Sequence, residues 1–239
     1  MAVERSVERF NRDVARNEGY LYSATDKLSC VLANRRISDA VLGMEDLRGK
    51  RVIDIGCGDG TYTLELAAAG AAEVLGVDAA SEAVERARER AADVENVRFD
   101  VVDIYELART PARFDVAVVR GILHHLYEVE RAIEQISRVA GVALVLEPNG
   151  YNPVLKILEK VSPYHVAHEE KSYAPRSLDR WFEACGGRVT RSEFIGLVPM
   201  FCPDPMARML KRLEPWVERT PGLRAIGCGQ YLQRIEMPG

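Results

Sequence analysis

The chain carries a glycine-rich turn between an apolar run and a helical stretch, and this unit constrains the fold more than any other. The apolar residues 51–55 lead directly into Gly56-Cys57-Gly58-Asp59-Gly60, and a helical pattern begins at Thr61. Glycine is needed in such a turn because the backbone must reverse tightly and approach a ligand without a Cβ in the way. The N-terminus of the helix that follows offers free N–H groups and a partial positive charge. The unit predicts a ligand site at the end of the first strand.

Short apolar runs alternate with helical stretches over the rest of the chain. Strands are expected at residues 51–55, 73–77, 97–102, 114–119, 142–147, 188–195 and 229–236, and helices at 61–69, 81–92, 128–139, 176–185 and 206–213. This alternation is typical of parallel strands joined by right-handed crossovers. The predicted fold class is α/β, with a seven-stranded, mostly parallel sheet covered by helices on both faces.

The pattern predicts one structural unit with two additions. Helical stretches at 3–17 and 26–42 precede the first strand, so residues 1–49 are expected to form an N-terminal helical cap. Residues 50–239 are expected to form the main domain, in which 151–213 contain a helical lid over a substrate. No linker divides the chain, and 239 residues with 47% hydrophobic content suit a single α/β core.

Composition excludes several function classes. Residues 51–150 hold 18 acidic against 10 basic side chains, so no nucleic-acid partner is expected at the glycine-rich unit. No apolar run reaches the roughly 20 residues of a membrane span. The five cysteines form no C-x-x-C pair and no leader is visible, which favours reduced thiols in the cytoplasm. No metal is expected, because no histidine or cysteine ligand spacing occurs.

The glycine-rich unit can be compared with two known nucleotide-binding motifs. Dinucleotide enzymes carry G-x-G-x-x-G, which would need glycine at position 61, where this chain has Thr61. The spacing present is Asp54-x-Gly-x-Gly-x-Gly, which resembles the first motif of the class I S-adenosylmethionine-dependent methyltransferases. Three further motifs of that family follow in order: a strand ending at Asp78, a strand ending in Asp103-Ile104, and a strand that begins Phe114-Asp115. The resemblance spans residues 50–147 and implies a Rossmann-like fold.

The resemblance also implies a cofactor, S-adenosylmethionine, with S-adenosylhomocysteine as product. In this family the acid at Asp78 accepts hydrogen bonds from both ribose hydroxyls, the acid at Asp103 meets the adenine amino group, and the apolar residue at Ile104 packs on the ring. For Asp54 a second role remains open, bonding to the neighbouring helix end or to the loop. The implied cofactor-binding set is Asp54, Gly56, Cys57, Gly58, Gly60, Asp78, Ala79, Asp103, Ile104 and Arg120.

The ends of the fourth and fifth strands carry the candidates for chemistry. A hydroxyl acceptor needs a base, and imidazole titrates near neutrality. His124 is the favoured base, His125 the alternative, and Glu147 the candidate for holding the ring. Neighbouring residues on a turn point about 100° apart, so at most one of the two histidines should face the pocket. His165 and His168 form a rival cluster, and a purely structural histidine pair also remains open.

The Leu-His-His-Leu segment resembles that of small-molecule methyltransferases. A small-molecule acceptor with an oxygen nucleophile is therefore expected. No Asn/Asp-Pro-Pro-aromatic motif follows the fourth strand, where Arg120-Gly121 stands, which disfavours amino-methylation of nucleic acid. Two alternatives remain: a non-catalytic nucleoside-binding module of the same fold, and a methyltransferase acting on protein or RNA.

Overall fold

The computed structural model describes residues 27–110, 113–162, 171–200 and 202–238. The predicted helix at 3–17 and the His165–His168 cluster lie outside these residues. Strands are β1 (Arg51–Ile55), β2 (Glu73–Asp78), β3 (Val97–Val101), β4 (Phe114–Arg120), β5 (Ala140–Pro148), β6 (Arg188–Ile195) and β7 (Gln230–Glu236). Helices are α2 (Leu28–Leu42), α3 (Thr61–Ala68), α4 (Ser81–Arg90), α5 (Val129–Val139), α6 (Pro153–Val161), α8 (Pro175–Ala184), α9 (Asp204–Arg219) and α10 (Leu223–Gly227), with the 3₁₀ helices η2 (Ile104–Arg109) and η3 (Leu123–His125).

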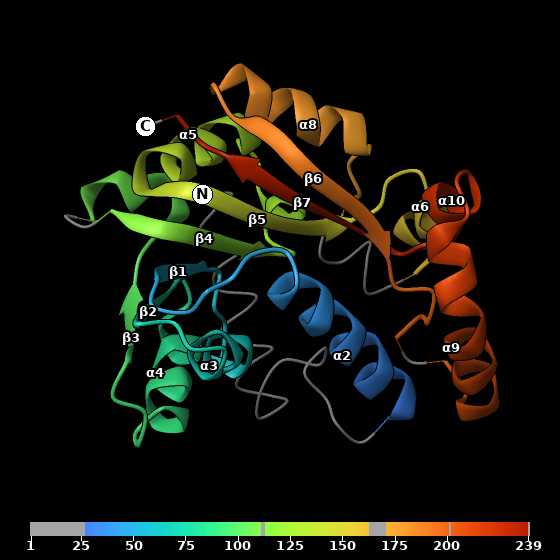
Figure 1. Cartoon of the computed structure of the whole chain (residues 1–239), viewed down its shortest axis with the longest axis horizontal. Coiled ribbons are helices and arrows are strands. Elements are labelled where there is room, and N and C mark those ends of the chain that lie inside the picture. Colours follow the sequence, from blue (N-terminus) through green and yellow to red (C-terminus); the bar gives the residue numbers. More distant parts are fainter. Residues whose placement is uncertain (1–26, 111–112, 163–170, 201, 239) are drawn as a thin grey trace.

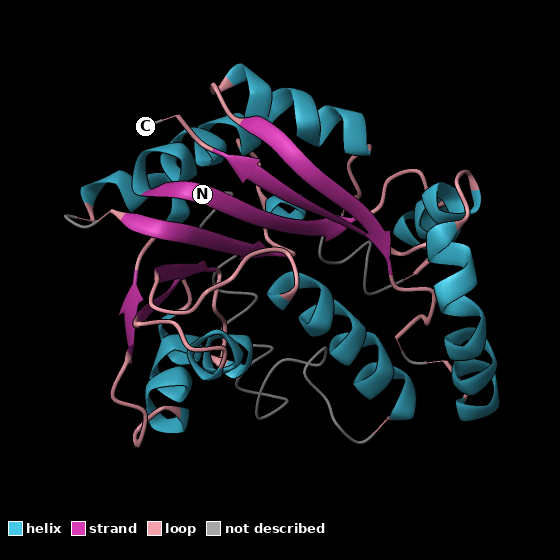
Figure 2. Ribbon diagram, in the orientation of Figure 1, coloured by secondary structure: helices cyan, strands magenta, loops and turns pink. Residues whose placement is uncertain are grey.

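The strands form one sheet in the order β3-β2-β1-β4-β5-β7-β6 (Figures 1 and 2). The first five strands are parallel, and β7 pairs antiparallel with both β5 and β6. The predicted seven-stranded, mostly parallel sheet is confirmed. The strand order reverses direction between β1 and β4, and ligands of open α/β sheets bind beside such a reversal, at the carboxyl ends of the strands.

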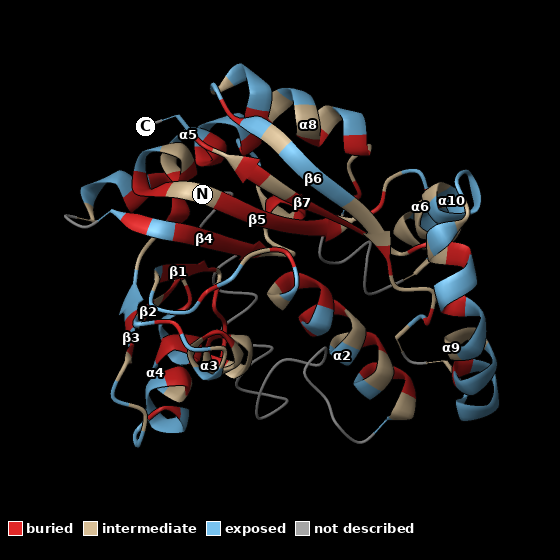
Figure 3. Cartoon of the chain, in the orientation of Figure 1, coloured by how far each residue is buried: buried red, intermediate tan, exposed pale blue. Residues whose placement is uncertain are grey.

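Each face of the sheet carries its own hydrophobic core, because alternate residues of a strand point to opposite faces. Figure 3 shows that the central strands β1, β4 and β5 are mostly buried. On β1, Ile53 joins the core beneath α5 and α8, whereas Val52 joins the core beneath α2, α3 and α4. On β4, Val119 and Val118 divide in the same way. The central strands are therefore buried on both faces, as expected of a parallel sheet.

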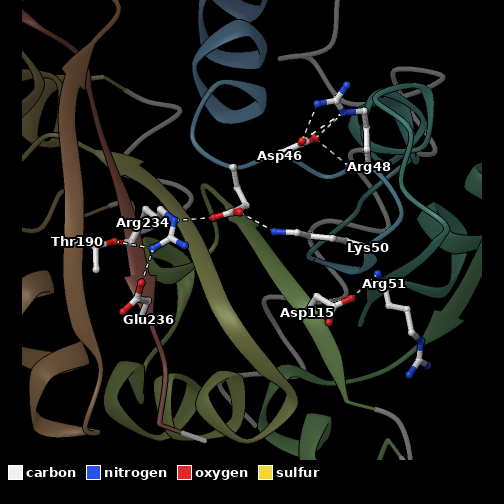
Figure 4. A network of polar contacts seen from close by, with 9 residues as sticks. Asp46, Arg48, Lys50, Arg51, Asp115, Thr190, Arg234 and Glu236 are labelled. Atoms are coloured by element: carbon white, nitrogen blue, oxygen red, sulfur yellow. Dashed lines mark hydrogen bonds and ion pairs between the residues drawn. The ribbon is translucent and has the colours of Figure 1, made fainter.

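A polar network fastens the connection between α2 and β1 to the antiparallel edge of the sheet (Figure 4). The Glu45 carboxylate accepts hydrogen bonds from Lys50 Nζ and Arg234 Nε, each at 2.6 Å. Arg234 in turn donates to Thr190 Oγ1 at 2.7 Å and to Glu236 at 3.1 Å. The end of α2 is thereby held against β7. Helix α2 lies on the same side of the sheet as α3, the helix that follows the glycine-rich turn.

Helices α6, α9 and α10 and the start of β5 differ from the sequence-based prediction. Helix α9 continues through Pro215 to Arg219, although the pattern predicted an end at residue 213. Helix α6 was not predicted; Asn152 caps it by accepting from the N–H groups of Val154 and Leu155, and Pro153 occupies its first turn. No loop separates α5 from β5, since the helix ends at Val139 and the strand begins at the next residue.

Candidate functional site

The glycine-rich turn lies at the end of β1 and is braced by β2. Gly56, Gly58 and Gly60 have φ of +77°, +54° and +76°, a region that side chains other than glycine rarely adopt. The N–H groups of Gly56 and Cys57 donate to the Val77 carbonyl at 2.7 and 3.1 Å. The backbone of the turn is therefore left-handed at three positions, which explains why the sequence places glycine at each.

Asp78 closes the turn from the tip of β2. One carboxylate oxygen accepts from the Gly58 N–H at 3.0 Å and the other from the Ala80 N–H at 2.8 Å. Burial raises the pKa of the Asp78 carboxyl, while these N–H donors act in the opposite direction. Asp78 thus has a role that the sequence did not predict, holding the loop in shape. Ala79 follows it, half-buried, in the connection to α4.

Asp54 lies beneath the turn on β1 and is buried. Its carboxylate accepts a hydrogen bond of 2.6 Å from the Thr63 hydroxyl on α3. Burial raises the pKa of Asp54 to about 6, although the Thr63 hydrogen bond and the Arg120 charge both lower it. The bond to the neighbouring helix is the second role that the sequence left open for this residue.

The raised pKa predicts a specific pH dependence of stability. A carboxyl with a folded pKa of about 6 and an ordinary value of 3.8 holds its proton more tightly in the folded protein, so ionisation favours unfolding. Through this group, the free energy of unfolding should therefore fall as the pH rises from about 4 to about 6. Asp54→Asn keeps an oxygen for Thr63 and removes the titration.

Urea unfolding of wild type and Asp54→Asn at pH 4 and pH 7.5 tests this. The variant should gain stability relative to wild type as the pH rises. A difference between the two proteins that stays constant with pH would contradict the titration of Asp54 in this window.

Arg120, at the end of β4, lies beside Asp54 in a small cavity. Its guanidinium carbon is 3.3 Å from the centroid of the Tyr62 ring, and Nη1 donates to the Ser38 hydroxyl at 3.2 Å. Nη1 is also 3.9 Å from the Glu65 carboxylate. Burial lowers the pKa of Arg120, and Nη2 is buried without a hydrogen-bond partner. Buried donors are almost always paired in native proteins, so an unpaired one marks a place where a ligand group fits.

Sequence reasoning proposed Arg120 but missed the residues around it. The cavity is lined by Ser38 of α2 and by Tyr62 and Glu65 of α3, together with apolar neighbours. These residues belong to no motif, and only the packing of α2 and α3 against β4 brings them together. Asp59 was also missed: it accepts from the Thr61 N–H and hydroxyl and pairs with Arg90 at 3.0 Å, which fixes the start of α3.

Asp103 and Ile104 lie after β3. The Asp103 carboxylate caps η2 by accepting from the Tyr105 N–H at 2.9 Å, and Ile104 is buried in the core beneath α5. Cys57 is buried within the turn, and burial raises the pKa of its thiol. The adenine contacts expected of Asp103 and Ile104 stay predictions.

His124 and Glu147 form a buried pair across the ends of β4 and β5. His124 Nδ1 lies 2.8 Å from a Glu147 carboxylate oxygen, and Glu147 also accepts from the N–H groups of Ile122, Leu123 and His124. A carboxylate accepts only, so the proton of the neutral ring resides on Nδ1 and Nε2 is the basic nitrogen. Glu147 therefore orients the ring and the backbone of η3 together.

His125 stands close to this pair. Its ring centroid is 3.9 Å from that of His124, with the planes tilted by 42°. The two rings therefore lie side by side on the η3 turn, although neighbouring side chains on a turn were expected to point about 100° apart. His125 is half-buried, whereas His124 is buried.

In the described part of the chain, no cluster of three or more His, Cys, Asp or Glu side chains is arranged to hold a metal ion. None of the helices in this part has both the length and the apolar character required to cross a membrane.

Comparisons with known proteins agree with this geometry. Residues 46–188 match a family model described as a methyltransferase domain. A 27-O-demethylrifamycin SV methyltransferase from Amycolatopsis mediterranei (strain S699) is 40% identical over 111 residues, which cover 45% of this chain and 41% of that protein. The matches span less than half the length of the first curated relatives.

Solved structures share the fold over nearly the whole chain. The [4+2]-cyclase SpnF has a TM-score of 0.68 at 20% identity, covering 98% of this chain and 93% of that one. The magnesium protoporphyrin IX methyltransferase from Synechocystis PCC 6803, solved with bound S-adenosylhomocysteine, has a TM-score of 0.63 at 16% identity, covering 97% and 94%. The chain belongs to the methyltransferase-domain family, among the class I S-adenosylmethionine-dependent methyltransferases with a Rossmann-like fold.

Proposed function

We propose that this chain transfers a methyl group from S-adenosylmethionine to an oxygen of a small-molecule acceptor. The observation that carries the proposal is the His124–Glu147 pair, placed beside the glycine-rich turn at the reversal of strand order. A ligand on the turn and a base on η3 would meet at the same edge of the sheet.

The cofactor supplies an electrophilic methyl group, and the chain supplies orientation and a base. His124 Nε2 would accept the proton of the acceptor hydroxyl as the new bond forms. Glu147 would stabilise the resulting imidazolium through Nδ1, while its bonds to the η3 backbone keep the ring in place. Glu147 lies on the buried strand β5, and its bonds to the backbone of η3 tie His124 to that strand.

Two observations support a small, oxygen-containing acceptor. The name of the Amycolatopsis relative describes a substrate that lacks a methyl group on an oxygen. The acidic residues 51–150 also disfavour a nucleic-acid acceptor, because wrapping nucleic acid needs a basic face. We further propose that residues 151–213 help to cover the acceptor, and that the chain works in the cytoplasm, as its cysteine pattern favours.

The residues near the turn fit the proposed cofactor at its amino-acid end. The unpaired Nη2 of Arg120 suits a carboxylate, and Asp54 and Glu65 lie near the same cavity to balance an ammonium group. We propose that Arg120 binds the carboxylate of the methionine moiety.

Replacing Arg120 by Met should test this without an acceptor. The variant should bind S-adenosylhomocysteine about 10- to 100-fold more weakly, because a charge-assisted hydrogen bond is lost. Its affinity for 5′-methylthioadenosine, which lacks the amino-acid end, should stay within about twofold of wild type. Calorimetry measures both. An equal loss for the two ligands would mean that Arg120 acts on the whole site and not on the carboxylate.

Turnover is the direct test of the proposed reaction. The purified chain is incubated with S-adenosylmethionine and a panel of phenolic, sugar and polyketide hydroxyl acceptors, and release of S-adenosylhomocysteine is measured by mass spectrometry. An acceptor-dependent release supports the proposal. Binding without turnover on any acceptor would favour a non-methylating role, and the SpnF likeness shows that this fold also serves a [4+2]-cyclase.

A further inference from the structure

Helix α9 presents an apolar stripe on its outer side. Met206, Met209, Leu213 and Trp216 follow one another at intervals of three, four and three residues, so they line one side of the helix. All four are exposed, with Met209 at 54% and Trp216 at 61%. In Figure 1 the helix stands at the edge of the molecule, beyond α2 and away from the sheet.

The inner side of α9 packs against the body of the protein. Ala207 and Val217 are buried, and Glu214 is 2% exposed, with its carboxylate accepting from the Leu197 N–H at 3.1 Å. Glu218 holds Arg36 of α2 through two guanidinium nitrogens and accepts from the Gly196 N–H. Two of the three acids of α9 therefore face the body of the protein.

The exposed charges of α9 are consequently almost all positive. Arg208, Arg212 and Arg219 are exposed and fall on a strip of the helix next to the apolar stripe. Among the residues of α9, all of which the structure describes, Asp204 is the one exposed acid, and it stands at the first position. The outer side is thus apolar and cationic, in a chain with a formal net charge of −4.

The neighbouring helices repeat this composition. Helix α10 packs against α9, and the Asn152 side chain that caps α6 donates to the carbonyls of Gly227 and Cys228 at the end of α10. Both helices expose apolar and basic side chains, namely Val154, Ile157, Lys160 and Val161 on α6 and Leu223, Arg224 and Ile226 on α10. We call the exposed residues of α6, α9 and α10 the basic-apolar surface.

We propose that the basic-apolar surface docks on an anionic lipid bilayer. An amphipathic helix with arginines beside its apolar stripe and a tryptophan within it is the pattern of interfacial binding, in which the apolar side enters the headgroup region and the basic residues meet lipid phosphates. A second copy fits less well, because a twofold contact would set the arginines of one copy against those of the other. A single outer helix is also convex, which a bilayer accommodates without a matching groove.

The test uses the full chain and vesicles of phosphatidylcholine, alone or with 30% phosphatidylglycerol. The protein should co-sediment with the anionic vesicles and only weakly with the neutral ones. Arg208→Glu with Arg212→Glu should weaken the partition onto anionic vesicles at least about 30-fold, because each basic residue near an anionic surface contributes about fivefold and the introduced carboxylates add repulsion. Brominated lipids should quench Trp216 in a Trp181→Phe background.

A matched pair controls for net charge. Arg138→Glu with Arg176→Glu makes the same charge change at exposed positions on α5 and α8, and it should leave the partition within about threefold. Equal loss in both pairs, or no binding to anionic vesicles, overturns the proposal. Lipid-independent dimerisation that Leu213→Gln abolishes, seen by analytical ultracentrifugation, would overturn the proposal and assign the surface to a second copy. Binding of an acidic protein that Arg208→Glu with Arg212→Glu abolishes, together with no binding to either kind of vesicle, would overturn it and assign the surface to a protein partner.

Discussion

Replacing His124 by Ala should lower kcat about 10²- to 10⁴-fold, because the acceptor hydroxyl would lose its base. Affinity for S-adenosylhomocysteine should stay within about threefold of wild type, since the role proposed for the ring is toward the acceptor hydroxyl and not toward the cofactor. The fold should survive, because Glu147 keeps its hydrogen bonds from the backbone N–H groups of η3 after the ring is removed. Steady-state kinetics with the best acceptor from the panel gives both parameters.

His125→Ala is the matched control, since it removes the neighbouring ring at 3.9 Å and leaves the Glu147 contact in place. The pH–rate profile separates a base from a packing residue: wild type and His125→Ala should both lose kcat at low pH, and His124→Ala should lose that limb. If His125→Ala is the inactive variant, the base is His125. If neither histidine matters, an already nucleophilic acceptor reacts through proximity alone and the proposed base is wrong.

Asp78→Ala should weaken S-adenosylhomocysteine binding at least about 100-fold. Two hydrogen bonds from ribose hydroxyls to a carboxylate contribute about 1.5 to 3 kcal/mol each, and the turn also loses its bonds from the Gly58 and Ala80 N–H groups. Because of those bonds, the variant should also melt at a lower temperature without ligand. Affinity is therefore measured by calorimetry well below the melting temperature of the variant.

Asp100→Ala is the control for that change. Asp100 lies on β3 beside Val77 of β2 and is exposed. Among the ion pairs of the described residues, Asp100 takes part in one, with Arg88 at 3.8 Å. It should bind S-adenosylhomocysteine like wild type. Affinity of Asp78→Ala within about threefold of wild type would show that the ribose hydroxyls have another partner.

The glycine-rich turn and the parallel sheet could be predicted because both follow from local rules. A tight turn with three left-handed residues requires glycine at those positions, and strands buried on both faces read as short apolar runs. The four motifs then order β1 to β4, and with them the edge at which Asp78, Asp103 and His124 lie.

Other features depend on contacts that no local pattern carries. Ser38 and Tyr62 reach Arg120 only after α2 and α3 have packed against β4. Glu147 was expected to hold the ring of His124, yet its bonds to the backbone of η3 follow from the pairing of β4 with β5. The sequence therefore named the candidate residues and the pairing of His124 with Glu147, whereas the partners of Arg120 and the bonds from η3 to Glu147 depend on tertiary packing.

Helix α9 shows how tertiary contacts override a local signal. The helical pattern predicted an end at residue 213, two residues before Pro215, and proline removes a backbone donor and usually ends a helix. The helix continues because residues on both sides of Pro215 are tied to the body, Glu214 through the Leu197 N–H and Glu218 through Arg36. Helix α6 was missed for a related reason, since its cap Asn152 is fixed by carbonyls near residue 228.

We expect the glycine-rich turn and Asp78 to bind S-adenosylmethionine and its product. Isothermal titration calorimetry of the purified chain with S-adenosylhomocysteine measures this binding, with NADH as the comparison ligand. The expected result is one site with a micromolar dissociation constant for S-adenosylhomocysteine and no saturable heat with NADH. Binding of NADH in place of S-adenosylhomocysteine, or no binding of either, would contradict it.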